Sequence, residues 1–116
     1  MASQQVGWTI DEYATADGER PIRAFISMLT GRAKVEAVAL IKLLEERGNA
    51  LRRPQSAPLG GGLFELRGDQ VRIFYLFRPG RRIVLLNGVL KKQRKVPAEA
   101  LMRAKRYQKE IKAMDA

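Results

Sequence analysis

Two arginines and a cluster of cations in the second half of the chain have the residue types of a phosphate-binding site. Arg67 and Arg72 lie close together, and Glu65 lies two residues before the first of them. Four of the five residues at 91–95 are cations, namely Lys91, Lys92, Arg94 and Lys95. A guanidinium grips two phosphate oxygens at once and keeps its charge, whereas lysines act as point charges. This combination favours binding of a phosphate group.

The two arginines belong to β-like runs that must position them. The runs Leu63–Arg67, Val71–Arg78 and Arg82–Leu90 are rich in β-branched, aromatic and aliphatic residues, and short breaks with Gly, Pro and Asp separate them. Breaks this short force neighbouring strands to pair antiparallel. The sequence therefore predicts a three-stranded meander.

The register of the first two strands decides whether the arginines share one surface. If the loop is Gly68 through Val71, Arg67 lies opposite Arg72, and two like charges directly opposite each other need a reason such as an anion. If the loop is one residue shorter, Arg67 faces Val71 and the pair is lost. The sequence leaves both registers open.

The cationic cluster at 91–95 also has two interpretations. A charge run is most often a solvated surface. Here, however, it lies at the end of the third strand, beside the two strand arginines, and this placement is typical of a phosphate-binding surface.

Composition excludes several classes of chemistry. The 116 residues, 46% of them apolar, suit one domain with one modest core. Without Cys or His, the chain has no disulfide, no thiolate nucleophile, no imidazole base and few transition-metal ligands. We expect neither a metal nor a cofactor.

The charge is concentrated in one half of the chain. The formal net charge is +10; residues 1–60 carry eight Lys and Arg against seven Asp and Glu, and residues 61–116 carry fourteen against five. RNA or DNA is the expected partner, although an acidic protein would suit the same surface. No run has the length of a membrane span and the N-terminus lacks a signal pattern, so we expect a cytoplasmic protein that does not contact membranes.

The remaining segments complete an α+β fold. Residues 8–13 alternate loosely and suit an edge strand added to the meander. Apolar spacing predicts helices at Pro21–Leu29 and about Gly31–Arg47, with Thr30 as a cap and Gly48 as a stop. Because almost nothing joins them, we expect an N-terminal helix hairpin that packs on a small, mostly antiparallel, twisted sheet.

The segment Asn49–Gly62 is predicted to be a connector. It contains two prolines, a run of glycines, and Arg52 and Arg53 as candidate RNA-binding residues. The glycines do not form a phosphate loop, because no Gly-Lys-Ser/Thr follows and a strand comes next where a helix is required.

A last helix is predicted to run from Pro97 to about Met114. Its apolar stripe is Ala100, Ala104, Tyr107, Ile111 and Met114. Most of its cations suit a solvated face, and Arg103 and Arg106 are candidates to extend a nucleic-acid surface.

The order of these elements resembles the phage-derived, HigB-like branch of the RelE/ParE toxin superfamily. A helix pair precedes the Gly-Gly-Leu-aromatic-Glu-Leu-Arg strand of Gly61–Arg67, an Arg-x-x-Tyr strand at Arg72, and a leucine-rich strand that runs into Lys-Lys-x-x-Lys-x-Pro, Lys91 to Pro97. The resemblance extends from about Trp8 to Ile111 and implies a single toxin domain.

The resemblance implies the toxin of a type II toxin–antitoxin pair. Such toxins mostly cut messenger RNA (mRNA) on the ribosome without a metal, and their usual partner is a helix-turn-helix antitoxin. Arg72 matches the main catalytic arginine of the family and Arg67 the supporting one. The basic cluster of the family is matched by Lys91, Lys92 and Lys95.

The chain departs from the family where a base is expected. Many relatives have a histidine at the position of Asn87 and an aromatic residue at that of Leu90, and some branches have lysine in place of Glu65. Cleavage through the RNA 2′-hydroxyl needs a proton acceptor. The candidates are Glu65, whose alternative role is a salt bridge to an arginine, and a lysine of the cluster, because crowding by other cations favours the neutral form of lysine.

Tyr75 and Tyr107 are expected in the core, without a chemical role. Two other functions share these features. One is a nucleic-acid-binding module without catalysis, and the other is inhibition of DNA gyrase, as in the related ParE-type toxins.

Overall fold

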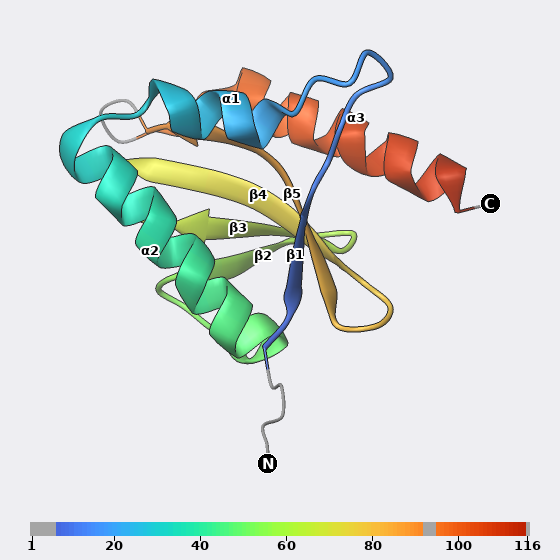
Figure 1. Ribbon diagram of the computed structural model, residues 1–116, viewed down its shortest axis with the longest axis horizontal. Coiled ribbons are helices and arrows are strands. Elements are labelled where there is room, and N and C mark those ends of the chain that lie inside the picture. Colours follow the sequence, from blue (N-terminus) through green and yellow to red (C-terminus); the bar gives the residue numbers. More distant parts are fainter. Residues whose placement is uncertain (1–6, 92–94, 116) are drawn as a thin grey trace.

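The structure is a computed structural model and describes residues 7–91 and 95–115. It has the predicted α+β architecture, in which three α-helices pack on a five-stranded, mostly antiparallel sheet (Figure 1). The described part of the chain contains no helix with both the length and the apolar character needed to cross a membrane.

The three strands of the predicted meander have the predicted bounds. They are β3 (Leu63–Arg67), β4 (Val71–Arg78) and β5 (Arg82–Leu90), and each pairs antiparallel with the next. The N-terminal edge strand is also present as β1 (Thr9–Glu12), which pairs parallel to the start of β5. Arg82 of β5 donates from Nε to the Asp11 carboxylate at 2.9 Å, which ties the two strands further.

The prediction of a plain connector at Asn49–Gly62 was wrong. It contains β2 (Ser56–Gly60), which pairs antiparallel with β3 and gives the sheet order β1-β5-β4-β3-β2. Pro58 and Gly60 obscure this strand in the sequence. An edge strand tolerates both, because a proline there need not donate to a neighbour and the register shift between them forms a bulge. A short 3₁₀ helix, η1 (Gly48–Ala50), precedes it.

The helices form where the apolar spacing predicts them. They are α1 (Pro21–Met28), α2 (Gly31–Arg47) and α3 (Ala98–Met114). Thr30 and Gly48 occupy the two cap positions of α2, but the Thr30 side chain makes no capping hydrogen bond. One correction concerns Met114, predicted in the apolar stripe of the last helix. It is 74% exposed, because the buried stripe ends one turn earlier at Ile111.

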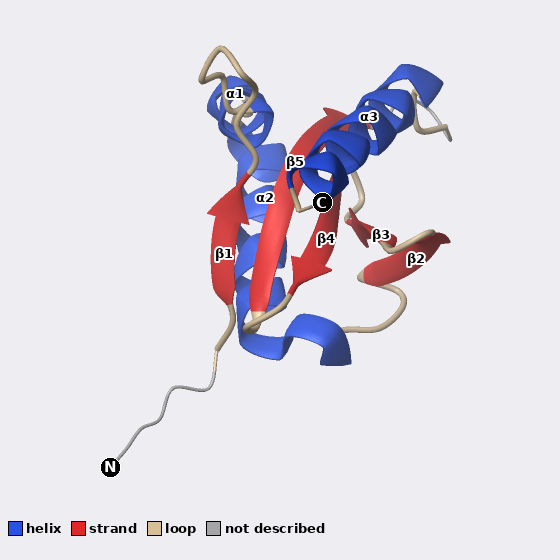
Figure 2. Cartoon of the chain, turned by 90° about the vertical axis from the view of Figure 1, so that its right-hand side faces the viewer, coloured by secondary structure: helices blue, strands red, loops and turns tan. Residues whose placement is uncertain are grey.

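Each face of the sheet has its own core. On one face α1 and α2 pack against residues such as Leu66, Ile73 and Leu85, and on the other α3 packs against residues such as Phe74 and Leu86. Figure 2 shows α3 and α2 at different sides of the strands. Both N-terminal helices thus cover one face as expected, while their contact with each other as an antiparallel hairpin stays a prediction.

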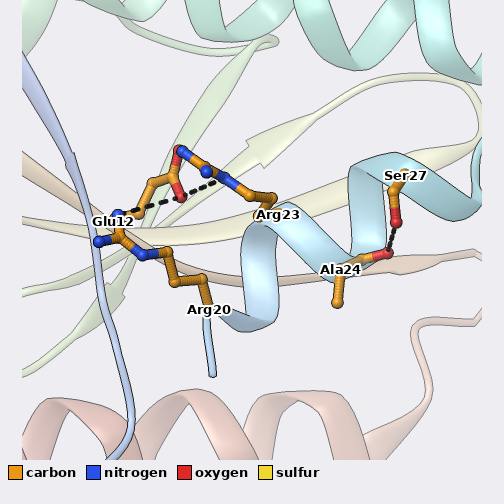
Figure 3. A network of polar contacts seen from close by, with 5 residues as sticks. All are labelled: Glu12, Arg20, Arg23, Ala24 and Ser27. Carbon is orange, nitrogen blue, oxygen red and sulfur yellow. Dashed lines mark hydrogen bonds and ion pairs between the residues drawn. The ribbon is translucent and has the colours of Figure 1, made fainter. Parts of the chain in front are cut away.

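Polar contacts fix the start of α1 beside the end of β1. The Glu12 carboxylate accepts from Nε and Nη2 of Arg23 at 3.1 and 3.2 Å, and Arg20 Nη1 lies 3.8 Å away (Figure 3). Later in the same helix, the Ser27 hydroxyl donates to the carbonyl of Ala24 at 2.8 Å. The contacts of Glu12 thus tie the start of α1 to β1.

Gly88 allows α1 to approach β5 closely. A Cβ at this position would lie 2.4 Å from a ring carbon of Phe25, which is 6% exposed and has little room to move. We expect Gly88→Ala to destabilise the fold by about 1–3 kcal/mol through overpacking. Urea unfolding measures the loss, with Gly7→Ala as the control, because a Cβ at Gly7 meets nothing closer than 3.4 Å. Equal stability of the two variants would contradict this packing.

Candidate phosphate-binding site

The structure has the register that brings the two strand arginines together. Arg67 pairs directly with Arg72 across β3 and β4, and the turn closes with the Gly68 amide donating to the Val71 carbonyl at 3.0 Å. The alternative pairing of Arg67 with Val71 is therefore wrong. By the alternation of side chains along a strand, both guanidiniums emerge on the face that α3 covers elsewhere.

A carboxylate from α2 holds this turn. Oε1 of Glu36 accepts from the amides of Gln70 and Val71 at 2.9 and 3.0 Å, and Oε2 accepts from the amide of Asp69 at 2.7 Å. Gly68 makes room for it, because a Cβ there would lie 2.4 Å from the Glu36 carboxyl carbon. The turn that sets the arginine register is thus bound to a helix distant in sequence.

Each arginine has its own partner. Nε of Arg67 donates to Oε1 of Glu65 at 2.8 Å, and Glu65 is only 5% exposed. Nη1 of Arg72 donates to the carbonyls of Gly68 and Val71, the latter at 3.0 Å. No ion pair to Arg72 occurs among the described residues, so its charge is not neutralised by a carboxylate there.

These cations line a hollow at one end of the sheet. It is lined by Arg53, Pro54, Gln55, Arg67, Gly68, Asp69, Arg72 and Lys91. Four of these side chains are cations and one is an acid, so the hollow suits an anion. We call it the arginine hollow. Lys91 is anchored at its rim because its amide donates to the Gln70 carbonyl at 2.7 Å.

Comparison with known families identifies the chain. The family model described as phage-derived protein Gp49-like (DUF891) matches residues 24–109, which is most of the chain. This protein belongs to the phage-derived Gp49-like family. The family is one of the RelE-like toxin families, and the matched span includes every residue of the arginine hollow. No curated protein matches the chain significantly.

Not all the cations predicted for the site of this Gp49-like protein lie in the hollow. Arg103 and Arg106 are exposed on α3, where Arg103 lies 3.9 Å from Glu99 and Arg106 packs over the Tyr107 ring. Arg52 is exposed and lines a neighbouring cleft. Their RNA-binding roles stay predictions.

The basic cluster is only partly described. Lys91 lines the hollow and Lys95 is exposed, whereas Lys92 and Arg94 lie outside the described residues. Sequence reasoning had grouped Arg53 with Arg52 and apart from the strand arginines. Arg53 lies three residues before the edge strand β2, whose pairing with β3 brings this segment to Arg67: the Arg67 amide donates to the Gln55 carbonyl at 2.8 Å.

Asn87, at the position where the family resemblance leads us to expect histidine, is buried in this protein. Its Nδ2 donates to the carbonyl of Ala100 in α3 at 3.1 Å, and the residue is 4% exposed. Asn87 therefore links α3 to the sheet, and its amide offers no base in place of an imidazole. Among the described residues, no cluster of carboxylates suits a metal ion.

The tyrosines are core residues, as predicted for Tyr75 and Tyr107. Tyr75 is 1% exposed, and burial raises the pKa of its hydroxyl despite the opposing effect of a hydrogen bond to Ser56. Burial, followed by the hydrogen bond to Glu110, raises the pKa of Tyr13 to about 12. Near neutral pH, neither hydroxyl ionises to serve as a base.

We expect the contact between Glu36 and the turn to hold the register of the arginine hollow. Glu36→Ala removes the acceptor of three amides, so we predict a loss of about 1–3 kcal/mol in unfolding free energy and faster hydrogen exchange at residues 69–71. The matched control is Glu46→Ala, on an exposed position of the same helix. Unchanged exchange at the three amides would show that Glu36 does not hold the turn.

Proposed function

We propose that this protein is the toxin of a type II toxin–antitoxin system and a metal-independent mRNA endoribonuclease of the HigB-like branch. Membership of the Gp49-like family supports the toxin, and the direct opposition of Arg67 and Arg72 supports the phosphate chemistry. Like charges directly opposite on a sheet are destabilising, so an anionic ligand is the natural reason to keep them.

The reaction uses the RNA itself as nucleophile. The 2′-hydroxyl of one nucleotide attacks the adjacent phosphorus, its oxygen forms a new P–O bond, and the bond to the 5′-oxygen of the next nucleotide breaks. A base takes the proton of the 2′-hydroxyl, and the departing 5′-oxygen takes a proton from water or from a protonated lysine of the basic cluster. The products are a 2′,3′-cyclic phosphate and a 5′-hydroxyl end, so no metal or cofactor is required.

Arg72 is the residue to which we assign stabilisation of the charge that builds on the phosphate oxygens. Its guanidinium is fixed by two backbone carbonyls and meets no described carboxylate, so its remaining N–H groups can face the phosphate. Arg67 supports it from the opposite strand. Glu65 is the positioning residue for Arg67, because a buried carboxylate bonded to that arginine is poorly placed to take a proton.

The proton acceptor is then a lysine of the basic cluster, and Lys91 is the one in the hollow. Lys92 and Lys95 are the alternatives. On the ribosome the message is positioned from outside the protein, which reduces what the base must contribute. The partners that we assign to this toxin are mRNA, held on the ribosome in the cytoplasm, and, from the family resemblance, a cognate helix-turn-helix antitoxin.

Primer extension on mRNA from cells that express the protein tests the activity. We expect discrete cuts within translated codons, a loss of about 10²–10³-fold in Arg72→Ala, and incomplete rescue by Arg72→Lys, which keeps the charge without the two-pronged grip. Arg47→Ala, at the exposed end of α2, is the control that removes one cation and leaves cleavage unchanged.

Two outcomes would sink the nuclease. If growth stops while the mRNA stays intact, inhibition of DNA gyrase becomes the assigned function, and plasmid supercoiling measures it. The second outcome is that Arg72→Ala weakens RNA binding only as much as the loss of one charge predicts, and that neither protein yields a cleavage product. The protein would then be a nucleic-acid-binding module without catalysis.

The role of Lys91 is testable by separating charge from proton transfer. Lys91→Arg keeps the cation but cannot accept a proton, so we expect it to lose cleavage as fully as Lys91→Ala, by about 10²–10⁴-fold. The measurement is the same primer extension, with RNA binding as the control for lost charge. Cleavage retained by Lys91→Arg would move the base to Lys92 or Lys95.

A further inference from the structure

A second cleft lies on the other face of the sheet, where α2 does not cover the ends of β3 and β4. It is lined by Asn49, Leu51, Arg52, Arg53, Ser56, Pro58, Phe64, Tyr75 and Phe77. Three of these residues are aromatic and two are arginines. We call it the aromatic cleft.

The rings of the aromatic cleft form a fixed group. Phe64 stacks on Tyr75 with centroids 5.5 Å apart, and Phe77 meets Phe64 edge-on at 5.1 Å. A hydrogen bond of 2.6 Å between the Tyr75 hydroxyl and Ser56 Oγ holds the innermost ring. Tyr75 is buried, whereas Phe64 and Phe77 are only partly buried and line the cleft. Trp8 packs against Phe77 as well, with centroids 5.3 Å apart.

Apolar packing alone does not account for the arginines beside these rings. Arg52 and Arg53 are both exposed, and no ion pair from either to a described carboxylate occurs. Arg52 donates from Nη1 to the Asn49 carbonyl at 3.2 Å, which holds it at the rim. Aromatic faces beside guanidiniums are the combination with which proteins bind single-stranded nucleic acid, through base stacking and backbone charge.

Arg53 connects the aromatic cleft to the arginine hollow, because it lines both. The two are otherwise separated by the start of β2: Pro54 and Gln55 line the hollow, while Ser56 and Pro58 line the cleft. A flexible single strand can therefore pass from one to the other around the edge of the sheet, with a phosphate at Arg53.

We propose that the aromatic cleft is a base-binding subsite for single-stranded RNA. An unpaired base stacks against Phe64 and Phe77, Arg53 binds the phosphate that follows it, and the strand continues to the arginine hollow. The inference rests on the proposed function, since it assigns a subsite to the same RNA. Stacking accepts any base, so the cleft adds affinity and direction and not a sequence preference.

The test compares binding of two short RNAs to the full chain. One is a 2′-O-methyl oligonucleotide, which lacks the nucleophile and stays intact, and the other has the same backbone with abasic positions. We expect the wild type to bind the intact RNA about tenfold more tightly, the fold-change of one stacked base at about 1.4 kcal/mol. Fluorescence anisotropy at fixed salt measures both affinities.

Three variants separate stacking from charge. Phe64→Leu combined with Phe77→Leu fills the cleft without a stacking surface, and we expect it to bind both RNAs equally. Arg53→Gln should weaken both RNAs alike and lower the slope of log affinity against log salt by about 1. Phe25→Leu, which alters the core under α1 and no cleft residue, is the control for a general loss of stability and should keep the tenfold preference.

Equal binding of intact and abasic RNA by the wild type would overturn the proposal. The cleft would then be assigned to binding an apolar side chain of a partner protein. A preference that survives in the double leucine variant would overturn it as well. The assay needs no cleavage. If the wild type prefers bases but cuts no message, the nuclease fails and the subsite stands; if it cuts message without that preference, the subsite alone fails.

Discussion

The contact between the Glu36 carboxylate and three amides of the β3–β4 turn is the interaction on which the rest of the site depends. A turn that presents three successive N–H groups can bind an anion by itself. Here α2 supplies that anion from within the chain, at 2.7 to 3.0 Å. The amides are therefore occupied, and recognition of an external phosphate is left to the guanidiniums on the next residues outward.

By holding the β3–β4 turn, Glu36 also fixes the register of these two strands. That register places two positive charges opposite each other, which is electrostatically unfavourable. Opposing Arg67 and Arg72 is unfavourable, whereas a slip of one residue would separate them. The fold tolerates the cost because each guanidinium has other acceptors, the Glu65 carboxylate for one and two backbone carbonyls for the other. The unneutralised charge that remains faces the arginine hollow, where an incoming phosphate would relieve it.

Local patterns predicted most of the fold, and long-range contacts explain what they missed. The bounds of β3, β4 and β5 followed from apolar runs between breaks of Gly, Pro and Asp, because those residues act within a few positions of themselves. Strand β2 was missed because Pro58 and Gly60 dominate its local signal, whereas the strand forms by pairing with β3 at the edge of the described sheet. Nothing near Glu36 in the sequence points to a turn more than thirty residues later.

The candidate site divides in the same way. Arg67, Arg72 and Lys91 were predictable because strand alternation and a strand end bring them together, once one of two registers holds. Arg53 lies in the hollow because of strand β2, which the sequence did not reveal. Arg103 and Arg106 lie on the exposed side of α3, which packs on the opposite face of the sheet from α1 and α2. Charge in the sequence thus indicated a partner, but only the packing separates cations that converge from those that merely face solvent.

The arginines of the hollow keep their charge near neutral pH, so they bind a phosphate by charge and geometry alone. Such a surface attracts any polyanion, and its affinity falls steeply with salt whatever the sequence of the ligand. A phosphate site alone therefore cannot select unpaired message over the abundant helical RNA of a ribosome. The proposed aromatic subsite, which shares Arg53 with the hollow, would supply that selection, because a base already paired and stacked in a helix is not available to Phe64 and Phe77.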